Sequence, residues 1–390
     1  MDEIWKPAYI HSTYPSEEFY SGRSGRAHLN KHELLVIIPH FPVAQGTGES
    51  ISKYPVFVKK LNLLRRYFRE CICITGVTGE KRIYREKGFT EIALDFSNYH
   101  IYMFRFVMTY LQLILRLRRR FVAVSLSVEP YVFASALLCK IWRSRFVMYL
   151  VSPLQFGHGL IRRIRMKLLL YLSDFVITLT PQMAEQAYRI HSRRPILILP
   201  NWPDASFRYL GLQRKPNTLL YVGRLSPEKR VDLLLGAMRI VASELADANL
   251  FIVGDGPERK RLEGLSISMG IEKKCSFLGW LSMDEVNEYY NTCEVLVFPS
   301  PNEYFPNILA ESIVARIPIV TIENDSYKWI VGKAGVFCQS NYLSLARGIL
   351  EVLQDPGKIS KMRLACVEAD LRMKRILNRQ LGKLDALLNQ

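Results

Sequence analysis

The sequence predicts an α/β protein made of two doubly wound domains, and three observations support this fold class. Short apolar runs alternate with helix-like segments through both halves of the chain, as in parallel sheets covered by helices. With 390 residues and a hydrophobic content of 49%, the chain can bury two cores. Several apolar runs end in loops rich in glycine and proline, where parallel sheets bind their ligands.

In the first half, no sustained periodicity is found before the first apolar run, so residues 1–32 are expected to be a polar extension. Apolar runs predict strands over residues 34–39, 71–75, 121–126, 146–151, 174–180 and 196–199. A basic amphipathic helix is expected over residues 51–69, either packed on the core or lying on a membrane surface. Further helices are expected over residues 101–117 and from Arg162 to about residue 172.

The second half repeats the alternation with clearer loop signals. Strands are predicted over residues 218–222, 249–253, 275–280, 295–298 and 318–322. One helix is expected to start at Ser226 or Pro227, and another near Glu303. Ser282 and Glu285 have the spacing of a capping box, and a long amphipathic helix is expected from Pro356 onward.

These elements predict a domain organisation with a linker in the middle of the chain. Residues 205–217 contain arginine, lysine and proline between two periodic regions, which is typical of an interdomain connection. The predicted parts are the extension (1–32), a first domain (33–205), a linker (206–217), a second domain (218–355) and a helical tail (356–390).

The positive charge of the chain is concentrated in its first half. Residues 1–210 hold 30 Lys and Arg against 15 Asp and Glu, which leaves 23 of the 53 basic and 21 of the 36 acidic residues for the remainder. A surface for anionic lipid headgroups, phosphorylated acceptors or nucleic acid would have this distribution. General solubility is the simpler alternative.

The cysteines and the N-terminal segment indicate the cellular compartment in which the protein works. Seven scattered cysteines lie mostly within apolar runs and form no Cys-x-x-Cys pair, which predicts buried free thiols in a reducing compartment rather than disulfides or a zinc site. The first 20 residues are polar and acidic, unlike a signal peptide, and no uncharged apolar run reaches the length of a spanning helix. We therefore expect a cytoplasmic protein that is peripheral on the cytoplasmic face of a membrane.

Two carboxylates, Glu303 and Glu311, follow the strand predicted over residues 295–298. If the helix began near Glu303, eight residues at 1.5 Å rise would separate the two side chains by roughly 12 Å. Because a glycosidase pair needs roughly 5 to 9.5 Å, the two acids more plausibly hold different parts of one extended ligand. Two glutamates at this spacing are also common on solvated helices.

Cationic side chains follow the strand predicted over residues 218–222. Arg224 and Lys229 are expected beside a helix N-terminus, which itself attracts anions. A guanidinium fork, an ammonium point charge and backbone N–H groups together would make a clamp for a diphosphate.

Four motifs in this order resemble retaining glycosyltransferases of family four, which have the GT-B fold. They are Pro-Asn-x-x-Asp at 200–204, Gly-Arg-x4-Lys at 223–229, Gly-Asp-Gly-Pro at 254–257 and Glu-x7-Glu at 303–311. The resemblance covers roughly residues 34–350 and is strongest over 174–320. It departs from the family at Arg230 and at Ala315-Arg316-Ile317, where the family has glycines.

The resemblance implies that the first domain binds the acceptor, that the second domain binds the donor and that the helical tail braces the first domain. It also implies a role for particular residues. Glu303 would face the donor sugar, Glu311 would hold the ribose, and Arg224 and Lys229 would stabilise the leaving diphosphate. The resemblance places the other donor contacts at Gly223, Gly254, Leu278, Asn307 and Ile308. The family's paired glycines correspond to Gly46 and Gly48, and His158 is the candidate to replace a histidine that the chain lacks at 150–153.

The resemblance therefore implies retaining transfer of a sugar from a nucleotide diphosphate sugar to a glycan or lipid-linked acceptor at a membrane surface. No Asp-x-Asp box occurs, so metal independence is expected, with no cofactor besides the sugar nucleotide substrate. The alternatives are a soluble acceptor, a sugar-nucleotide epimerase, or a non-enzymatic binder of sugar nucleotides or nucleic acid. Of the possible partners, nucleic acid is the least favoured. An anionic membrane surface would bind to the basic first domain.

Overall fold

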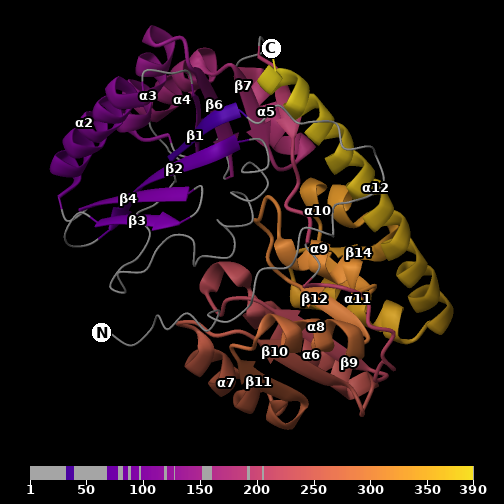
Figure 1. Ribbon diagram of the computed structural model, residues 1–390. Coiled ribbons are helices and arrows are strands. Elements are labelled where there is room, and N and C mark those ends of the chain that lie inside the picture. Colours follow the sequence, from indigo (N-terminus) through magenta and orange to yellow (C-terminus); the bar gives the residue numbers. More distant parts are fainter. Residues whose placement is uncertain are drawn as a thin grey trace. The chain divides into compact units, whose positions relative to one another are not determined.

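The structure is a computed structural model that describes residues 32–38, 68–77, 82–86, 89–95, 98–117, 121–126, 128–151, 160–190, 194–203 and 206–389 (Figure 1). The described residues form two compact units. One unit contains those up to Pro200 together with those from Asn378 onward, and the other contains Asn201–Leu377. Each unit is a sheet with helices packed against it.

The first unit is built on an eight-stranded sheet with the order β3-β4-β2-β1-β5-β6-β7-β8. Its strands are β1 (His32–Ile38), β2 (Phe68–Val77), β3 (Arg82–Glu86), β4 (Phe89–Asp95), β5 (Val122–Ser125), β6 (Arg145–Leu150), β7 (Phe175–Thr178) and β8 (Ile196–Ile198). Every neighbouring pair is parallel except β3 and β4. Strands β5 and β7 are buried along their whole length, as strands covered on both faces must be.

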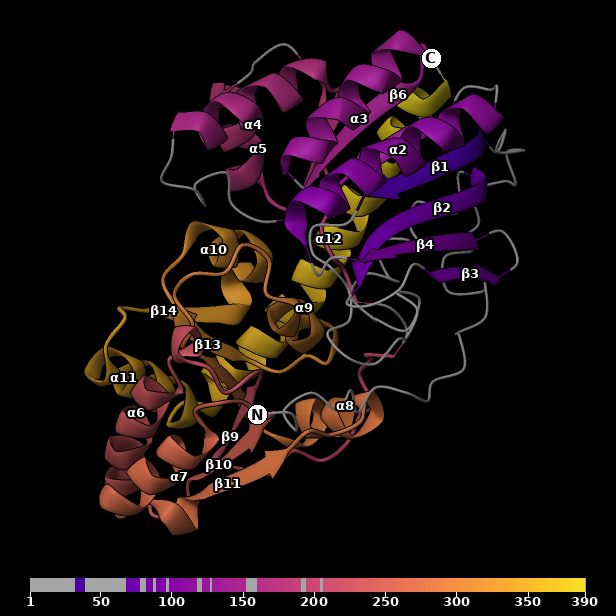
Figure 2. The same cartoon turned by 90° about the vertical axis from the view of Figure 1, so that its left-hand side faces the viewer.

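Four described helices belong to this sheet. They are α2 (Tyr99–Leu117), α3 (Pro130–Ile141), α4 (Leu160–Leu172) and α5 (Pro181–Ile190). Helix α3 contacts both α2 and α4, and the three lie side by side in Figure 2. The apolar stretch predicted over 101–117 is confirmed as the helix between β4 and β5, and the helix from Arg162 is confirmed as α4.

Parts of the first-half prediction need correction or fall outside the described residues. The helix expected over 51–69 lies mostly outside them, but its last two positions, Phe68 and Arg69, belong to β2, where parallel pairing with β1 extends the strand. The hairpin of β3 and β4 was not predicted, because its alternating charged residues resemble an exposed loop. The predicted extension, residues 1–32, lies outside the described residues apart from His32, which starts β1.

The second unit has a six-stranded sheet with the order β11-β10-β9-β12-β13-β14, and all its pairs are parallel. Its strands are β9 (Thr218–Val222), β10 (Asn249–Val253), β11 (Cys275–Gly279), β12 (Val295–Phe298), β13 (Ile319–Ile322) and β14 (Gly335–Cys338). The direction of strand order reverses between β9 and β12. Ligands of open α/β sheets bind at the carboxyl ends of strands at such a reversal.

The helices of the second unit follow the strands in alternation. They are α6 (Val231–Glu244), α7 (Arg259–Ser268), α8 (Met283–Thr292), α9 (Asn307–Val314), α10 (Asp325–Val331), α11 (Tyr342–Leu353) and α12 (Pro356–Asn389), with 3₁₀ turns η3 (Pro227–Lys229), η4 (Glu272–Lys274) and η5 (Gly332–Ala334). The predicted capping box at Ser282 is confirmed, since its hydroxyl accepts from the Glu285 N–H and the Glu285 carboxylate accepts from the Ser282 N–H.

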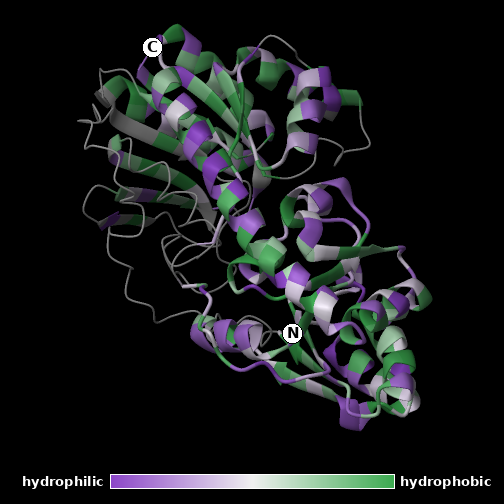
Figure 3. Ribbon diagram, turned by 90° about the vertical axis from the view of Figure 1, so that its right-hand side faces the viewer, coloured by the Kyte–Doolittle hydropathy of each residue, from purple (hydrophilic) through white to green (hydrophobic). Residues whose placement is uncertain are grey.

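Buried apolar side chains of this unit form one continuous core beneath α6 and α11. It includes Leu219 and Tyr221 of β9, Leu234 of α6 and Ile349 of α11, each fully buried. Figure 3 shows the strands mostly in the hydrophobic colour, whereas α12 carries both colours along its length. All seven cysteines are free and buried, which confirms that part of the prediction.

Helix α12 confirms the long amphipathic helix predicted from Pro356. Its buried residues include Met362, Cys366, Met373 and Leu377, a spacing of four and seven that keeps them on one face. Beyond Leu377 the helix belongs to the first unit, where the Gln380 side chain accepts from the Ile198 N–H and Arg145 donates to the Leu387 carbonyl.

Within the described residues, we find no helix that combines the length and the apolar character needed to cross a bilayer.

Candidate functional site

The candidate site lies where β9 and β12 end, at the reversal of strand order in the second unit. Gly223 and Arg224 follow β9 directly, and the loop of residues 299–306 follows β12. The Lys229 ammonium lies 2.6 Å from a carboxylate oxygen of Glu303. Their side chains are 21% and 25% exposed, so the pair remains open to a ligand while most of each side chain is covered.

The loop that carries Glu303 is held by a buried tyrosine. The Tyr327 hydroxyl accepts from the Glu303 N–H at 2.8 Å and donates to the Ser300 carbonyl at 3.0 Å. The Ser300 hydroxyl in turn donates to the Glu228 carbonyl at 3.3 Å, which links this loop to η3. The backbone at Glu303 is therefore fixed relative to the segment that carries Lys229.

Two helix starts differ from the prediction. Pro227–Lys229 form a single 3₁₀ turn, Arg230 follows in the left-handed region with a φ of 54°, and α6 begins only at Val231. Lys229 therefore ends a short turn and does not lie in the first turn of an α-helix. Likewise α9 begins at Asn307 and not near Glu303, because Pro306 occupies its N-cap position.

The later start of α9 removes the basis for the helical spacing between the two glutamates. Glu303 lies in the loop, while Glu311 lies in α9 and accepts a hydrogen bond of 3.0 Å from the Tyr290 hydroxyl of α8. The two carboxylates thus have different partners on different elements. That they hold different parts of one ligand stays a prediction.

The loops after β9 and β10 are in backbone contact. The Gly223 N–H donates to the Val253 carbonyl at 2.9 Å, and the Leu225 N–H donates to the Asp255 carbonyl at 2.9 Å. A Cβ atom at Gly254, whose φ is 124°, would lie 2.0 Å from the Gly223 carbonyl oxygen. Only glycine fits there, so Gly254 allows the two loops to pack together at the site.

The other predicted donor contacts lie near these loops to differing extents. Asn307 and Ile308 are the first residues of α9, and the Ile308 Cδ1 atom lies 3.6 Å from the position that a Cβ of Gly223 would take. The Asn307 side-chain oxygen is buried and has no hydrogen-bond partner among the described residues. Leu278 is half-buried in β11, at the far edge of the sheet.

Three ionisable side chains at the site have shifted pKa values. The hydrogen bond from Ser226, and to a smaller extent the charges of Lys229 and Arg224, hold the pKa of Glu228 below its usual value. Burial raises the pKa of Tyr221 and of Tyr327, so both hydroxyls stay protonated and able to donate. Arg224 is exposed, and its carbonyl accepts from the Tyr221 hydroxyl at 3.0 Å.

The structure thus brings Gly223, Arg224, Lys229, Gly254 and Glu303 onto the adjoining loops of β9, β10 and β12. Gly46, Gly48 and His158 lie outside the described residues.

The sequence reasoning missed Tyr290 and Tyr327. A fully buried tyrosine needs a partner for its hydroxyl, but the sequence alone does not show which carboxylate or backbone group supplies it.

We find no cluster of three or more His, Cys, Asp and Glu side chains arranged as metal ligands in the part of the chain that the structure describes.

Comparison with known proteins identifies the class of the second unit. Residues 204–370 match the family model for glycosyl transferases group 1. An uncharacterized glycosyltransferase of Methanocaldococcus jannaschii is 32% identical over 153 residues, which is 38% of this chain and 39% of that protein. Alpha-monoglucosyldiacylglycerol synthase of Acholeplasma laidlawii is 27% identical over 157 residues, or 39% of each chain. The second unit therefore contains a glycosyltransferase group 1 domain, and the matched stretch spans 39% of each of these two relatives.

Solved structures extend the likeness to almost the whole chain. Sucrose-phosphate synthase from Thermosynechococcus elongatus has a TM-score of 0.70 at 18% identity, covering 92% of this chain and 99% of its own. HepE of Anabaena, in complex with UDP, has a TM-score of 0.69 at 15% identity, covering 91% and 100%. The chain has a GT-B-like α/β fold with parallel sheets, as predicted.

Proposed function

We propose that this chain transfers a sugar from a nucleotide diphosphate sugar to an acceptor, with retention of the anomeric configuration. The observation that carries the proposal is the Lys229–Glu303 pair at the reversal of strand order, with Glu311 held separately by Tyr290. The group 1 domain supports a glycosyltransferase, and the UDP complex of HepE supports a nucleotide donor.

The proposed roles follow from the charges of the side chains. The donor diphosphate would lie against Arg224 and Lys229, which supply positive charge after β9, and Gly254 would leave room for it. Glu303 would accept hydrogen bonds from hydroxyls of the donor sugar, and Glu311 from those of the ribose. In the free protein, Lys229 and Glu303 neutralise one another. When the donor binds, Lys229 would contact its diphosphate and Glu303 its sugar, so these two contacts would replace the ion pair.

The proposed reaction breaks the bond between the anomeric carbon and a diphosphate oxygen. The acceptor hydroxyl oxygen forms the new bond on the same face, and its proton passes to the leaving phosphate. Negative charge grows on the diphosphate as the bond breaks, and Arg224 and Lys229 would stabilise it where it develops. Because these cations can take that part, we propose that no metal ion is needed, so chelation by EDTA should leave the rate unchanged. Loss of activity with EDTA and recovery with a divalent cation would refute this part.

The experiment that tests the donor site is a thermal-shift panel of nucleotide diphosphate sugars on the wild type and Glu311→Ala. One class of nucleotide should raise the melting temperature of the wild type and not that of the variant, because the ribose loses its acceptor. Glu351→Ala, at an exposed position of α11, is the matched control and should respond like the wild type. If no nucleotide stabilises the wild type, the proposed function is wrong.

We further propose that the acceptor is lipid-linked or glycan material at the cytoplasmic face of a membrane. The supporting surface is the outer face of α2, α3 and α4, which we call the α2–α4 surface. Its exposed apolar residues are Ile101, Phe104, Met108, Leu115, Leu137, Ile141, Leu160, Ile161, Ile164, Leu168 and Tyr171.

The charges of the α2–α4 surface fit an anionic membrane. The three helices contain no Asp or Glu, while α4 exposes Arg163 and Lys167 beside its apolar residues and α2 exposes Arg105. Exposed apolar side chains flanked by basic ones are typical of helices that lie in the membrane interface. The free buried cysteines suit a reducing compartment.

Sedimentation with phospholipid vesicles tests this surface. The wild type should pellet with vesicles containing phosphatidylglycerol and less with pure phosphatidylcholine, because the basic residues add an attraction that salt screens. Ile161→Glu combined with Ile164→Glu should abolish pelleting. Ile267→Glu, at a residue of α7 that is 64% exposed, is the matched control. Equal pelleting of the double variant would refute the assignment of this surface.

The alternative activities give different products from the same donor. An epimerase would convert the sugar nucleotide without an acceptor, and a soluble-acceptor enzyme would not respond to vesicles. A binder would take up the donor and release no nucleotide diphosphate. Donor consumption with and without a lipid extract therefore separates these alternatives.

A further inference from the structure

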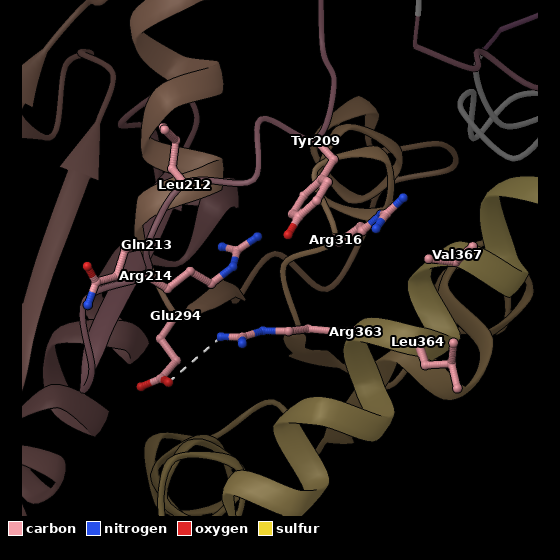
Figure 4. Close-up of a pocket in the computed structure, with 9 residues that line it drawn as sticks. All are labelled: Tyr209, Leu212, Gln213, Arg214, Glu294, Arg316, Arg363, Leu364 and Val367. Atoms are coloured by element: carbon pink, nitrogen blue, oxygen red, sulfur yellow. Dashed lines mark ion pairs between the residues drawn. The ribbon is translucent and has the colours of Figure 1, made fainter.

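A cavity lies in the second unit, at the opposite end of the sheet from the proposed donor site. It has a volume of about 540 Å³ and is lined by Tyr209, Leu212, Gln213, Arg214, Glu294, Arg316, Arg363, Leu364 and Val367 (Figure 4). Glu294 directly precedes β12, and Arg316 precedes β13. Glu303 follows β12, so the four residues of that strand separate the two places by roughly 13 Å.

Three arginines and a single carboxylate, that of Glu294, line this cavity. Arg214 and Arg363 extend toward one another from opposite sides, and the Arg316 guanidinium carbon lies 4.2 Å from the centre of the Tyr209 ring (Figure 4). Burial raises the pKa of the Cys366 thiol to about 12, and the charges of Arg214, Arg316 and Arg363 each act against that rise. All three guanidinium groups therefore lie close enough to the Cys366 sulfur to act on it electrostatically.

The single carboxylate does not neutralise them. Glu294 accepts from the Asn217 N–H at 2.7 Å, while its distance to the Arg363 guanidinium is 3.9 Å, at the limit for an ion pair. With three guanidinium groups and one carboxylate, the cavity holds two excess positive charges. Burial and, after it, the charge of Arg363 lower the pKa of Arg214 to about 10, as expected for cations that lack a counter-ion.

The arginines of the cavity also differ in how many of their N–H groups find acceptors in the protein. Arg214 is committed to the fold, since it donates to the carbonyls of Tyr290 at 2.8 Å and Ala315 at 2.7 Å. The Arg363 Nε–H, in contrast, is buried and has no acceptor among the described residues. A buried charged donor without an acceptor costs free energy, so the fold does not fully satisfy the Arg363 guanidinium.

We propose that this cavity is a binding site for a phosphate monoester. A monoester carries a charge of about −1.5 to −2 at pH 7, which matches the two excess charges, and arginine forks suit its oxygens. A volume of 540 Å³ lies within the range of small-molecule sites, and Tyr209, Leu212 and Val367 provide an apolar wall for the organic part. The ligand would connect the segment after the first unit with α12.

Calorimetric titration of the full chain with glycerol 3-phosphate at low salt, with glycerol as the uncharged control, tests the site. One monoester should bind per chain, and glycerol should not. Arg363→Gln should weaken binding at least tenfold, because a charged hydrogen bond contributes about 1.5–3 kcal/mol. Arg375→Gln, at an exposed position of the same helix, is the matched control and should bind like the wild type.

Arg316→Gly is a second variant that keeps the proposal testable if Arg363→Gln unfolds. Arg316 has a φ of 58°, which glycine adopts without strain, so this variant should fold and bind at least severalfold more weakly. The same titration with vesicles containing phosphatidate separates a soluble metabolite from a lipid headgroup as the source of the phosphate. Absence of saturable binding would overturn the proposal, as would binding that Lys229→Ala abolishes and both cavity variants retain.

Discussion

Arg230 and Arg316 have φ angles of 54° and 58°, in the left-handed region that glycine adopts most easily. Arg230 stands where the resembling family carries glycine, and Arg316 lies in the stretch 315–317 that lacks the family's glycine before Pro318. Both left-handed conformations are ones that glycine adopts without strain. A left-handed conformation costs a residue with a side chain about 1–2 kcal/mol. The chain therefore has the left-handed backbone conformation at both positions although each carries an arginine.

A pair of substitutions at Arg230 tests this reading of the backbone. Arg230→Gly should leave the free energy of unfolding unchanged or raise it by up to about 1 kcal/mol, because relief of strain offsets the entropy of glycine. Arg230→Val should lower it by at least about 1 kcal/mol, since β-branched residues tolerate this region poorly. Both variants lose the ion pair with Asp232, so the difference between them isolates the backbone term. Equal stabilities in urea would contradict it.

Substitution of Lys229 gives the most direct test of the proposed chemistry. Lys229→Ala should lower kcat by about 10²–10³, because one preorganised charge at the leaving group is lost. Steady-state kinetics with the donor found by the thermal-shift panel measure this. Lys260→Ala removes an exposed lysine of α7 and should leave kcat unchanged. A change confined to KM in Lys229→Ala would reduce its role to binding.

At the scale of elements, the site depends on how closely the loops after β9 and β10 approach one another. Gly254 makes this contact possible, and two backbone hydrogen bonds, from Gly223 to Val253 and from Leu225 to Asp255, hold the loops together. The 3₁₀ turn before α6 then places Lys229 against the loop after β12. Local sequence could not show this turn, since Ser-Pro-Glu is an equally good start for an α-helix.

Gly254→Ala should disrupt this arrangement. The new Cβ would lie 2.0 Å from the Gly223 carbonyl oxygen, so we expect the free energy of unfolding to fall by at least about 2 kcal/mol, with loss of donor binding. Gly264→Ala is the matched control, because that glycine lies in α7 with nothing within 4 Å of the added Cβ. It should stabilise the protein by roughly 0.5–1 kcal/mol. Urea unfolding of both variants decides the matter, and a tolerated Gly254→Ala would refute the close packing.

At the scale of the whole molecule, six buried thiols with raised pKa values couple the fold to alkaline pH. Burial raises the pKa of Cys338 to about 11 and that of Cys139, Cys275 and Cys293 to about 12. The native thiols therefore keep their protons above pH 9, where those of the unfolded chain are lost. Stability from this source is complete below about pH 8.5 and is lost as pH rises toward 12.

We predict a falling free energy of unfolding between pH 9 and 11, with each such thiol contributing about 1.4 kcal/mol per pH unit. Arg214 acts in the opposite direction above pH 10, because its lowered pKa lets the native state release a proton first. Urea unfolding at pH values across this range measures the combined effect of the thiols and Arg214 on the free energy of unfolding. Iodoacetamide should label the thiols only after unfolding, and rapid labelling of the native protein would contradict their burial.

Much of this protein follows from its sequence, because its signals are local. Apolar runs at 218–222, 249–253 and 295–298 must be buried on both faces, and parallel strands covered by helices bury them. The order of the four motifs placed Gly223, Arg224, Lys229 and Gly254 on strand-to-helix loops, where the structure has them. The capping box at Ser282 and the long helix from Pro356 are likewise matters of spacing.

The tertiary structure alone decided which side chains meet. Lys229 and Glu303 are 74 residues apart in sequence, and their contact depends on β12 pairing with β9 rather than with β11. The partners of Glu311 and Glu303, Tyr290 and Tyr327, lie on other helices. The arginine-lined cavity joins residues 209–214, 294, 316 and 363–367, which no periodicity connects. Sequence patterns report the burial of each segment, whereas pairing between segments is decided by the free energy of the whole packed core.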